Sequence, residues 1–248
     1  MKTPPECDIQ EFLVRLSEVL GVTATTPRCG VPFLNLSFAV KSLAGNVFSP
    51  IGLGVYGLFF TPPGGEKERL IYAGMYRGPK KAPFGGHIVK DRWWTHAASV
   101  TMRGHRISIA KRTSSQLVGL LSFSSPHDFQ HLAVPANPLC LHKDNGCAAG
   151  INRVLFAKTH WDFFGSANEA NILAPFRIVY LRLGSKPPGM DGDTLRAEIN
   201  QIEQRLIAAL LPVCNDETKW GTARYDVSME MFIPDVQRQL CHLWRRFG

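Results

Sequence analysis

The chain has 248 residues, of which 45% are hydrophobic and 19% are charged. This length and apolar content are typical of a globular protein with a buried core, and the absence of internal repeats and low-complexity tracts excludes a disordered or repeat-built chain. The formal net charge of +8 and the pI of about 9.3 favour a polyanionic partner, because clustered Lys and Arg bind phosphates by releasing counterions.

The chain opens without the basic and apolar regions of a signal peptide, and no apolar run reaches membrane-spanning length. We therefore expect a soluble, cytoplasmic protein. Residues 6–20 place apolar side chains at helical spacing, with acidic residues and Arg15 on the other face. This pattern predicts an amphipathic helix within an N-terminal arm, residues 1–25, that packs on the core; dimerisation and DNA contact are the alternatives.

Two predicted strands each carry a tyrosine. Residues 53–60 and 69–76 are apolar, aromatic runs of strand length, and the Pro-Pro-Gly-Gly sequence at 62–65 excludes a helix between them. We expect a hairpin with a long loop, in which Tyr56 and Tyr72 project to the same side.

A helix is expected to follow the hairpin. Asp91 can cap a helix that begins at Arg92. Arg92 and His96 are four residues apart, so they share one face of such a helix. A guanidinium, an imidazole and the two phenols can then converge on one site.

The segment between the hairpin and this helix, residues 77–91, is a basic loop rich in Gly and Pro. It suits phosphate contact, because its charge is dense and glycine lets backbones approach closely. A solvated loop is the alternative. Its candidate DNA-binding residues are Arg77, Lys80, Lys81 and Lys90.

Basic side chains also precede an apolar segment at 117–123. Such residues favour groove contacts, since Arg is the side chain best suited to guanine edges; a solvent-facing helix or strand is the alternative. The candidate DNA-binding residues here are Arg103, Arg106, Lys111 and Arg112.

Four side chains further along are of types that bind zinc, but their spacing lacks the close pairs of a structural site, so we favour unrelated core and loop positions. These four are Cys140, His142, Cys147 and His160. Candidate DNA contacts in the same region are Asn152, Lys158, His160, Trp161 and Asp162.

Residues 176–183 predict a third strand of the sheet, ended by Gly and Pro. Asp191 or Asp193 can cap a following helix over residues 194–211, closed by Pro212. A short basic helix over residues 236–244 is expected near the C-terminus, with DNA contact and a solvated end as alternatives.

Glu203 lies at the edge of the apolar face of the 194–211 helix, between Ile199 and Leu206. A buried carboxylate requires a cation or donors, so we expect a metal ion or, alternatively, an ion pair with an Arg of the sheet. Glu198 is expected to face solvent. Asn215 follows the helix end, where asparagine commonly caps or turns the chain.

Three groups of these residues, in this order, resemble the GIY-YIG nuclease family. Gly54-Val55-Tyr56 stands for the first signature and Tyr72-Ala73-Gly74 for the second. The segment from Glu203 to Asn215 looks like that family's metal-binding glutamate helix and the asparagine after it. The Arg and His at helical spacing are most similar to the restriction-endonuclease branch.

The resemblance implies an α+β fold, with a small three-stranded antiparallel sheet flanked by helices, in a single domain of residues 1–248. The catalytic core would comprise residues 51–100 and 175–216. The insertion at 101–174 would read the target, because the catalytic hairpin is too small to read a sequence unaided. Additions at 1–25 and 217–248 complete the chain.

The resemblance also implies in-line attack of water on a DNA phosphodiester, with one metal ion. Tyr56 would be the base or its relay if nearby cations lower the pKa of the phenol, and Tyr72 would orient the water or a phosphate oxygen. Glu203 would hold Mg²⁺, for which Mn²⁺ can substitute. The other expected roles are phosphate binding by Arg92, hydrogen bonding by His96, and phosphate positioning or loop bracing by Asn215.

The branch implies a type II restriction endonuclease that cuts a short, specific sequence in double-stranded DNA. A palindromic site would require a homodimer in which each subunit cuts one strand. Two alternatives remain: a structure-specific repair or homing-type nuclease, and a DNA-binding protein that does not cleave.

Overall fold

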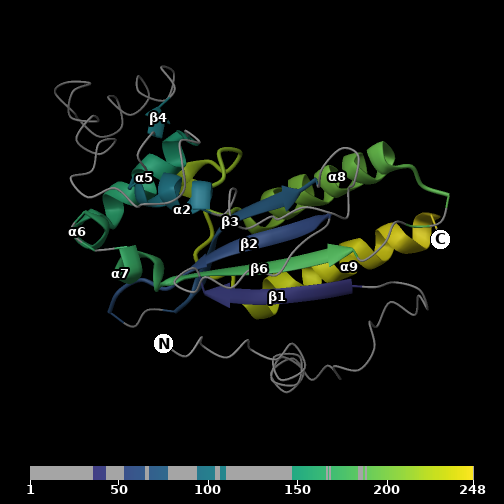
Figure 1. Cartoon of the computed structure of the whole chain (residues 1–248), viewed down its shortest axis with the longest axis horizontal. Coiled ribbons are helices and arrows are strands. Elements are labelled where there is room, and N and C mark those ends of the chain that lie inside the picture. The colour runs from purple at the N-terminus through teal and green to yellow at the C-terminus, as the bar shows by residue number, and fades with distance from the viewer. Residues whose placement is uncertain are drawn as a thin grey trace.

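Four antiparallel strands form the main sheet (Figure 1), in the order β1-β6-β2-β3. They are β1 (Leu36–Ser42), β2 (Gly54–Phe60), β3 (Arg69–Tyr76) and β6 (Phe176–Leu183). The computed structural model describes residues 36–42, 53–64, 67–77, 94–103, 107–109, 147–165, 167, 169–183, 187 and 189–247.

The three predicted strands are β2, β3 and β6, and their antiparallel pairing confirms the expected α+β class. The sheet is nevertheless wider than predicted, because β1 pairs antiparallel with β6 along its whole length. β2 lies between β6 and β3 and is buried throughout, which explains its unbroken apolar and aromatic sequence.

Helices cover both faces of the sheet (Figure 1). One face packs against α8 (Gly192–Leu210) and α9 (Met229–Phe247), around side chains such as Val55, Phe59 and Phe232. The other face packs against α2 (Trp94–Thr101), α5 (Ile151–Thr159), α6 (Trp161–Phe164) and α7 (Glu169–Leu173). The alternation of β2 side chains between these two cores places Tyr56 on the second face.

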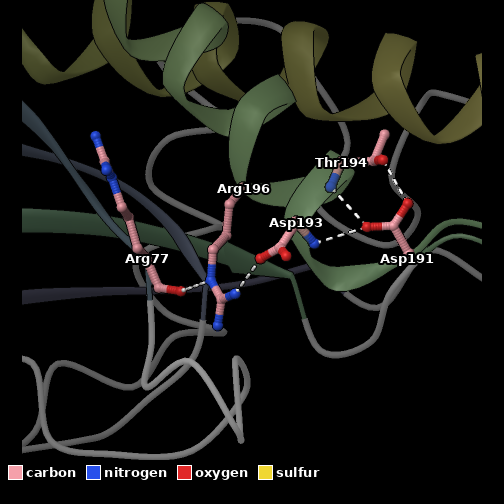
Figure 2. Close-up of polar contacts among 5 residues, drawn as sticks. All are labelled: Arg77, Asp191, Asp193, Thr194 and Arg196. Atoms are coloured by element: carbon pink, nitrogen blue, oxygen red, sulfur yellow. Dashed lines mark hydrogen bonds and ion pairs between the residues drawn. The ribbon is translucent and has the colours of Figure 1, made fainter.

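The helix expected at 194–211 is α8, and Asp191 is its N-cap (Figure 2). The Asp191 carboxylate accepts hydrogen bonds from the backbone N–H groups of Asp193 and Thr194, at 2.8 and 2.9 Å. The helix ends at Leu211, which adopts a left-handed conformation with φ of 46° just before Pro212.

The prediction for Glu198 was wrong. Its side chain is buried against α9, and its carboxylate accepts a hydrogen bond of 2.5 Å from Arg246. The short basic helix expected near the C-terminus is instead the 19-residue α9, which packs on α8 and so covers Glu198. A carboxylate between two helices needs this cation.

Residues 147–173 belong to the expected insertion, and their described part contributes to the core of the second face. Phe156 of α5, Phe164 of α6 and Ile172 of α7 are all buried there. A small parallel sheet joins β4 (Ile107–Ile109) to β5 (Cys147–Ala149). The 1–25 arm lies outside the described residues, among which no helix has the length and apolar character needed to cross a membrane.

Candidate active site

Two tyrosines and a histidine meet on the face of the sheet that carries α2 and α5. The Tyr56 hydroxyl lies 2.6 Å from Nε2 of His96, a hydrogen bond whose donor depends on the tautomer of the ring. The Tyr72 ring lies beside both, with its centroid 4.4 Å from that of His96 and 6.2 Å from that of Tyr56. All three side chains are buried, so the predicted convergence of phenols and imidazole is present.

Gly74 makes the close approach of the two tyrosines feasible. Tyr56 and Gly74 are directly opposite each other on β2 and β3. A Cβ atom at position 74 would lie 2.6 Å from the Tyr56 hydroxyl oxygen and 2.8 Å from Cε1 of Tyr72. The last residue of the Tyr72-Ala73-Gly74 motif is therefore a steric requirement of the site, because Tyr56 crosses β3 at this position.

The helix turn that follows His96 is braced by side-chain hydrogen bonds within α2. The Ser99 hydroxyl donates to the carbonyl of His96 at 2.9 Å, and the Thr101 hydroxyl donates to the carbonyl of Ala97 at 2.7 Å. The described helix begins at Trp94, and the expected cap Asp91 and the expected phosphate ligand Arg92 lie outside the described residues.

Arg153 of α5 is a member of the site that the sequence analysis missed. Its guanidinium carbon lies 4.9 Å from the centroid of the Tyr72 ring. Its Nη1 donates to Oγ of Ser99 at 2.9 Å, and its Nε donates to the carbonyl of Cys214 at 3.4 Å. Burial raises the pKa of the nearby Asp216 carboxyl, and the positive charge of Arg153 opposes that shift.

Glu203 reaches the edge of β3 from α8. Its Oε1 accepts a hydrogen bond of 3.0 Å from the backbone N–H of Met75, the residue after Gly74. A Cβ atom on Gly74 would lie 2.6 Å from the Tyr56 hydroxyl oxygen, and Gly74 is bonded to Met75. With standard bond lengths, the Glu203 Oε1 atom therefore lies within about 10 Å of the Tyr56 hydroxyl oxygen. The carboxylate is half-buried, as its place on the helix predicts.

Asn215 is a structural residue of the same strand edge. Its Oδ1 accepts from the backbone N–H of Ala73 and its Nδ2 donates to the carbonyl of Ala73, both at 2.8 Å. The amide thus pairs with β3 as a neighbouring strand would. Of the two expected roles of Asn215, this geometry supports loop bracing, because both ends of the amide are occupied by backbone.

The loop of Asn215 is in turn fixed by Asn152 of α5. The Asn152 amide donates to the carbonyls of Asn215 and Thr218, both at 2.6 Å, and its side chain is 2% exposed. Asn152 is therefore not a DNA contact, and the prediction for this residue was wrong. Lys158 and Asp162, two other candidates from this region, are exposed.

Side chains of α8 cap the far end of the same edge (Figure 2). Arg196 donates from Nε to the carbonyl of Arg77 at 3.2 Å and from Nη1 to Asp193 at 2.8 Å. The exposed side chain of Arg77 donates to Oδ1 of Asn200 at 3.2 Å. Arg77 thus remains a candidate for DNA contact at the start of the basic loop.

Arg103 corrects another prediction. Its side chain is 1% exposed and donates to the backbone carbonyls of Phe164 and Ala167. Burial lowers the pKa of its guanidinium. Arg103 joins α2 to the end of α6, so it cannot reach a DNA groove. The other DNA-binding candidates, Lys80, Lys81, Lys90, Arg106, Lys111 and Arg112, lie outside the described residues.

His160, the one proposed zinc ligand whose side chain is described, packs in an aromatic cluster. Its ring centroid lies 4.9 Å from that of Phe60 and 4.8 Å from that of Phe156, and its Nε2 lies 3.5 Å from Nη2 of Arg69. Within the described ranges no three His, Cys, Asp or Glu side chains gather as a metal site would require. Cys140 and His142 fall outside those ranges.

Comparison of the chain with models of known protein families, with curated proteins and with solved structures found no match in any of the three. The geometry of the site is therefore the basis for assigning a function to this chain.

Proposed function

We propose that the chain is a divalent-cation-dependent DNA endonuclease of the GIY-YIG type. The observation that carries the proposal is the hydrogen bond between Tyr56 and His96, formed across Gly74 beside the Tyr72 ring. Tyr56 and His96 are 40 residues apart in the chain, and Tyr72 of the second motif lies beside both. This meeting of residues from the two motifs and the helix supports the proposal.

The metal is proposed to be Mg²⁺ at Glu203. The Glu203 carboxylate reaches the backbone beside the signature motif, where its Oε1 accepts from the Met75 N–H. Magnesium takes few protein carboxylates and completes its shell with water and substrate phosphate, so a single glutamate suits it. When bound, Mg²⁺ supplies a Lewis acid that stabilises the charge on the leaving 3′ oxygen.

The protein side chains would handle the attacking water. In the proposed reaction the water oxygen bonds to phosphorus, the bond from phosphorus to the 3′ oxygen breaks, and the water proton passes to the Tyr56–His96 pair. Tyr56 is 1% exposed whereas Tyr72 and His96 are 8% and 7% exposed. Tyr56 therefore acts as the relay behind His96, and Tyr72 orients the water.

The biological role that we propose is a type II restriction endonuclease acting on a short duplex sequence as a homodimer. The net charge of +8 and the exposed Arg77 at the start of a basic loop support a DNA partner. Discrete fragments from a plasmid of known sequence would support this role, whereas dependence on branched DNA would favour a structure-specific nuclease.

Glu203→Gln is the sharpest test of the catalytic proposal. Glutamine keeps a carbonyl oxygen to accept from the Met75 N–H but loses the charge that binds the cation. We expect Glu203→Gln to fold, to bind DNA, and to lose cleavage by about 100-fold or more. Cleavage at the wild-type rate would show that Glu203 only caps the strand edge.

A second candidate function is a DNA-binding protein that does not cleave. It is favoured by one observation, the structural use of the Glu203 carboxylate at the β3 edge. Digestion of duplex DNA with Mg²⁺ distinguishes the two candidate functions. A protein that only binds DNA would leave the bound duplex intact at every protein concentration.

A further inference from the structure

Arg153 carries a positive charge with no ion-pair partner in the part of the chain that the structure describes. It is half-buried in the first turn of α5, and its neighbours are a tyrosine ring, a hydroxyl and a backbone carbonyl. Among the residues that the structure describes, no carboxylate forms an ion pair with it, and Asp216 acts on it only from a greater distance. A partly desolvated guanidinium in this position favours binding of an anion.

The guanidinium is also fixed in direction. Nη1 is used by Ser99, Nε is directed at the carbonyl of Cys214, and the plane lies near the Tyr72 ring. Nη2 makes no hydrogen bond within the described parts of the chain. Two donor atoms therefore anchor the group, and the third remains available to a ligand that approaches Tyr72.

We propose that Arg153 binds a phosphate of the DNA backbone through Nη2, beside Tyr72 and His96. Arginine suits this role because it stays charged and its donors match phosphate oxygens. The proposal rests on the proposed nuclease function for the identity of the substrate, and it assigns substrate binding to α5, an element of the insertion.

The same contacts would align the catalytic groups when phosphate binds. Ser99 accepts from Arg153 and donates to the carbonyl of His96, so the guanidinium is connected to the helix turn that carries the imidazole. Arg153 contacts Tyr72 directly through the face of its ring. Removal of the guanidinium should lower both phosphate affinity and the rate of the chemical step.

The test compares Arg153→Met with Arg238→Met. Arg238 is exposed on α9 and pairs only with Asp235 three residues away, so its removal controls for the loss of one positive charge. Inorganic phosphate is the first probe, measured as the rise in unfolding temperature relative to sodium chloride of equal ionic strength. Phosphate stabilises proteins non-specifically, so the difference between the two variants isolates the site.

We expect wild type and Arg238→Met to show the same phosphate response and Arg153→Met to show a smaller one. Single-turnover cleavage of duplex DNA should fall about 100-fold in Arg153→Met and stay unchanged in Arg238→Met. Arg153→Lys, which retains charge and most of the packing, should keep part of the phosphate response and provides the measurement if the Met variant does not fold.

Two outcomes separate this inference from the nuclease proposal. If wild type never cleaves DNA but Arg153→Met loses the phosphate response, the proposed phosphate site is supported and the proposed nuclease function is contradicted. If wild type cleaves DNA, and the Arg153 variants match Arg238→Met in both phosphate response and cleavage rate, the phosphate site is overturned and the nuclease stands.

Discussion

The side chains of Tyr56 and Tyr72 occupy the space that a Cβ atom of residue 74 would need. A single methyl group at this position therefore forces one ring to move. Movement of the Tyr56 ring would lengthen or break its 2.6 Å hydrogen bond to His96. Close positioning of reacting groups contributes strongly to catalysis, so a small displacement has a large effect on rate.

Gly74→Ala should reduce single-turnover DNA cleavage by about 100-fold and lower the free energy of unfolding by about 1–3 kcal/mol. Gly221→Ala is the matched control, because a Cβ atom there meets nothing within 4 Å. Rates and urea unfolding curves of both variants give the comparison. Equal cleavage rates for Gly74→Ala and wild type would show that the close packing of Tyr56 and Tyr72 is not needed for catalysis.

Asn215→Asp tests whether this residue is structural. The carboxylate cannot donate to the carbonyl of Ala73, which is buried with it, so the free energy of unfolding should fall by about 3 kcal/mol. Asn200→Asp is the control, since its Oδ1 only accepts from the exposed Arg77. Unchanged stability together with lost cleavage would instead assign Asn215 to the chemistry.

At the scale of elements, α8 is defined by its N-cap. Hydrogen bonds to Asp191 from the hydroxyl and backbone of Thr194, and from the backbone of Asp193, lower the pKa of the Asp191 carboxyl. A lowered folded-state pKa stabilises the fold above the unfolded pKa of about 4, and this contribution disappears as pH falls through the folded value.

Wild type should therefore lose more stability than Asp191→Asn between about pH 5 and pH 2. Asparagine is an equally good N-cap but does not titrate, so the comparison removes only the ionisation. Urea unfolding at several pH values measures the difference. Identical pH profiles for the two proteins would show that the cap carries no ionic component.

The sequence predicted elements better than it predicted partners. The bounds of β3 and β6 were predicted correctly and β2 begins one residue later than expected, because apolar runs ended by Gly and Pro define strands locally. The pairing of β1 with β6 depends on contacts far apart in the chain. Glu198 was misplaced for the same reason, since helical periodicity on α8 does not reveal that α9 covers it.

Long-range contacts also decided which basic residues face solvent. The local sequence does not distinguish Arg103 from Arg153, because each is a cation among both polar and apolar residues. Only the fold places Arg103 on the carbonyls of Phe164 and Ala167, and Arg153 on Ser99 and the Tyr72 ring. The net charge favoured a polyanionic partner, but composition does not show which cations are buried in the fold and which stand beside the candidate site.

Across the whole molecule, the site forms where the two covering layers of helices meet the same strand. From one face, α2 and α5 bring His96 and Arg153 to Tyr72 of β3. From the other, α8 brings Glu203 to Met75 of β3. The β3 edge is otherwise paired by the Asn215 side chain and by the backbone of Cys214 and Val227, and the Arg196 side chain bonds to Arg77 just beyond it. These contacts protect the edge from pairing with another chain and fix the site on a rigid strand.

The most direct test of the central claim is single-turnover digestion of a plasmid of known sequence, with fragment ends mapped, by wild type and Tyr56→Phe. Phenylalanine retains the Tyr56 ring and removes its hydroxyl, and with it the hydrogen bond to His96. We predict discrete double-strand breaks with Mg²⁺, none with a chelator, and a loss of about 100-fold or more in Tyr56→Phe. Wild-type protein that binds the plasmid yet leaves it intact with Mg²⁺, or Tyr56→Phe that cuts at the wild-type rate, would contradict the account.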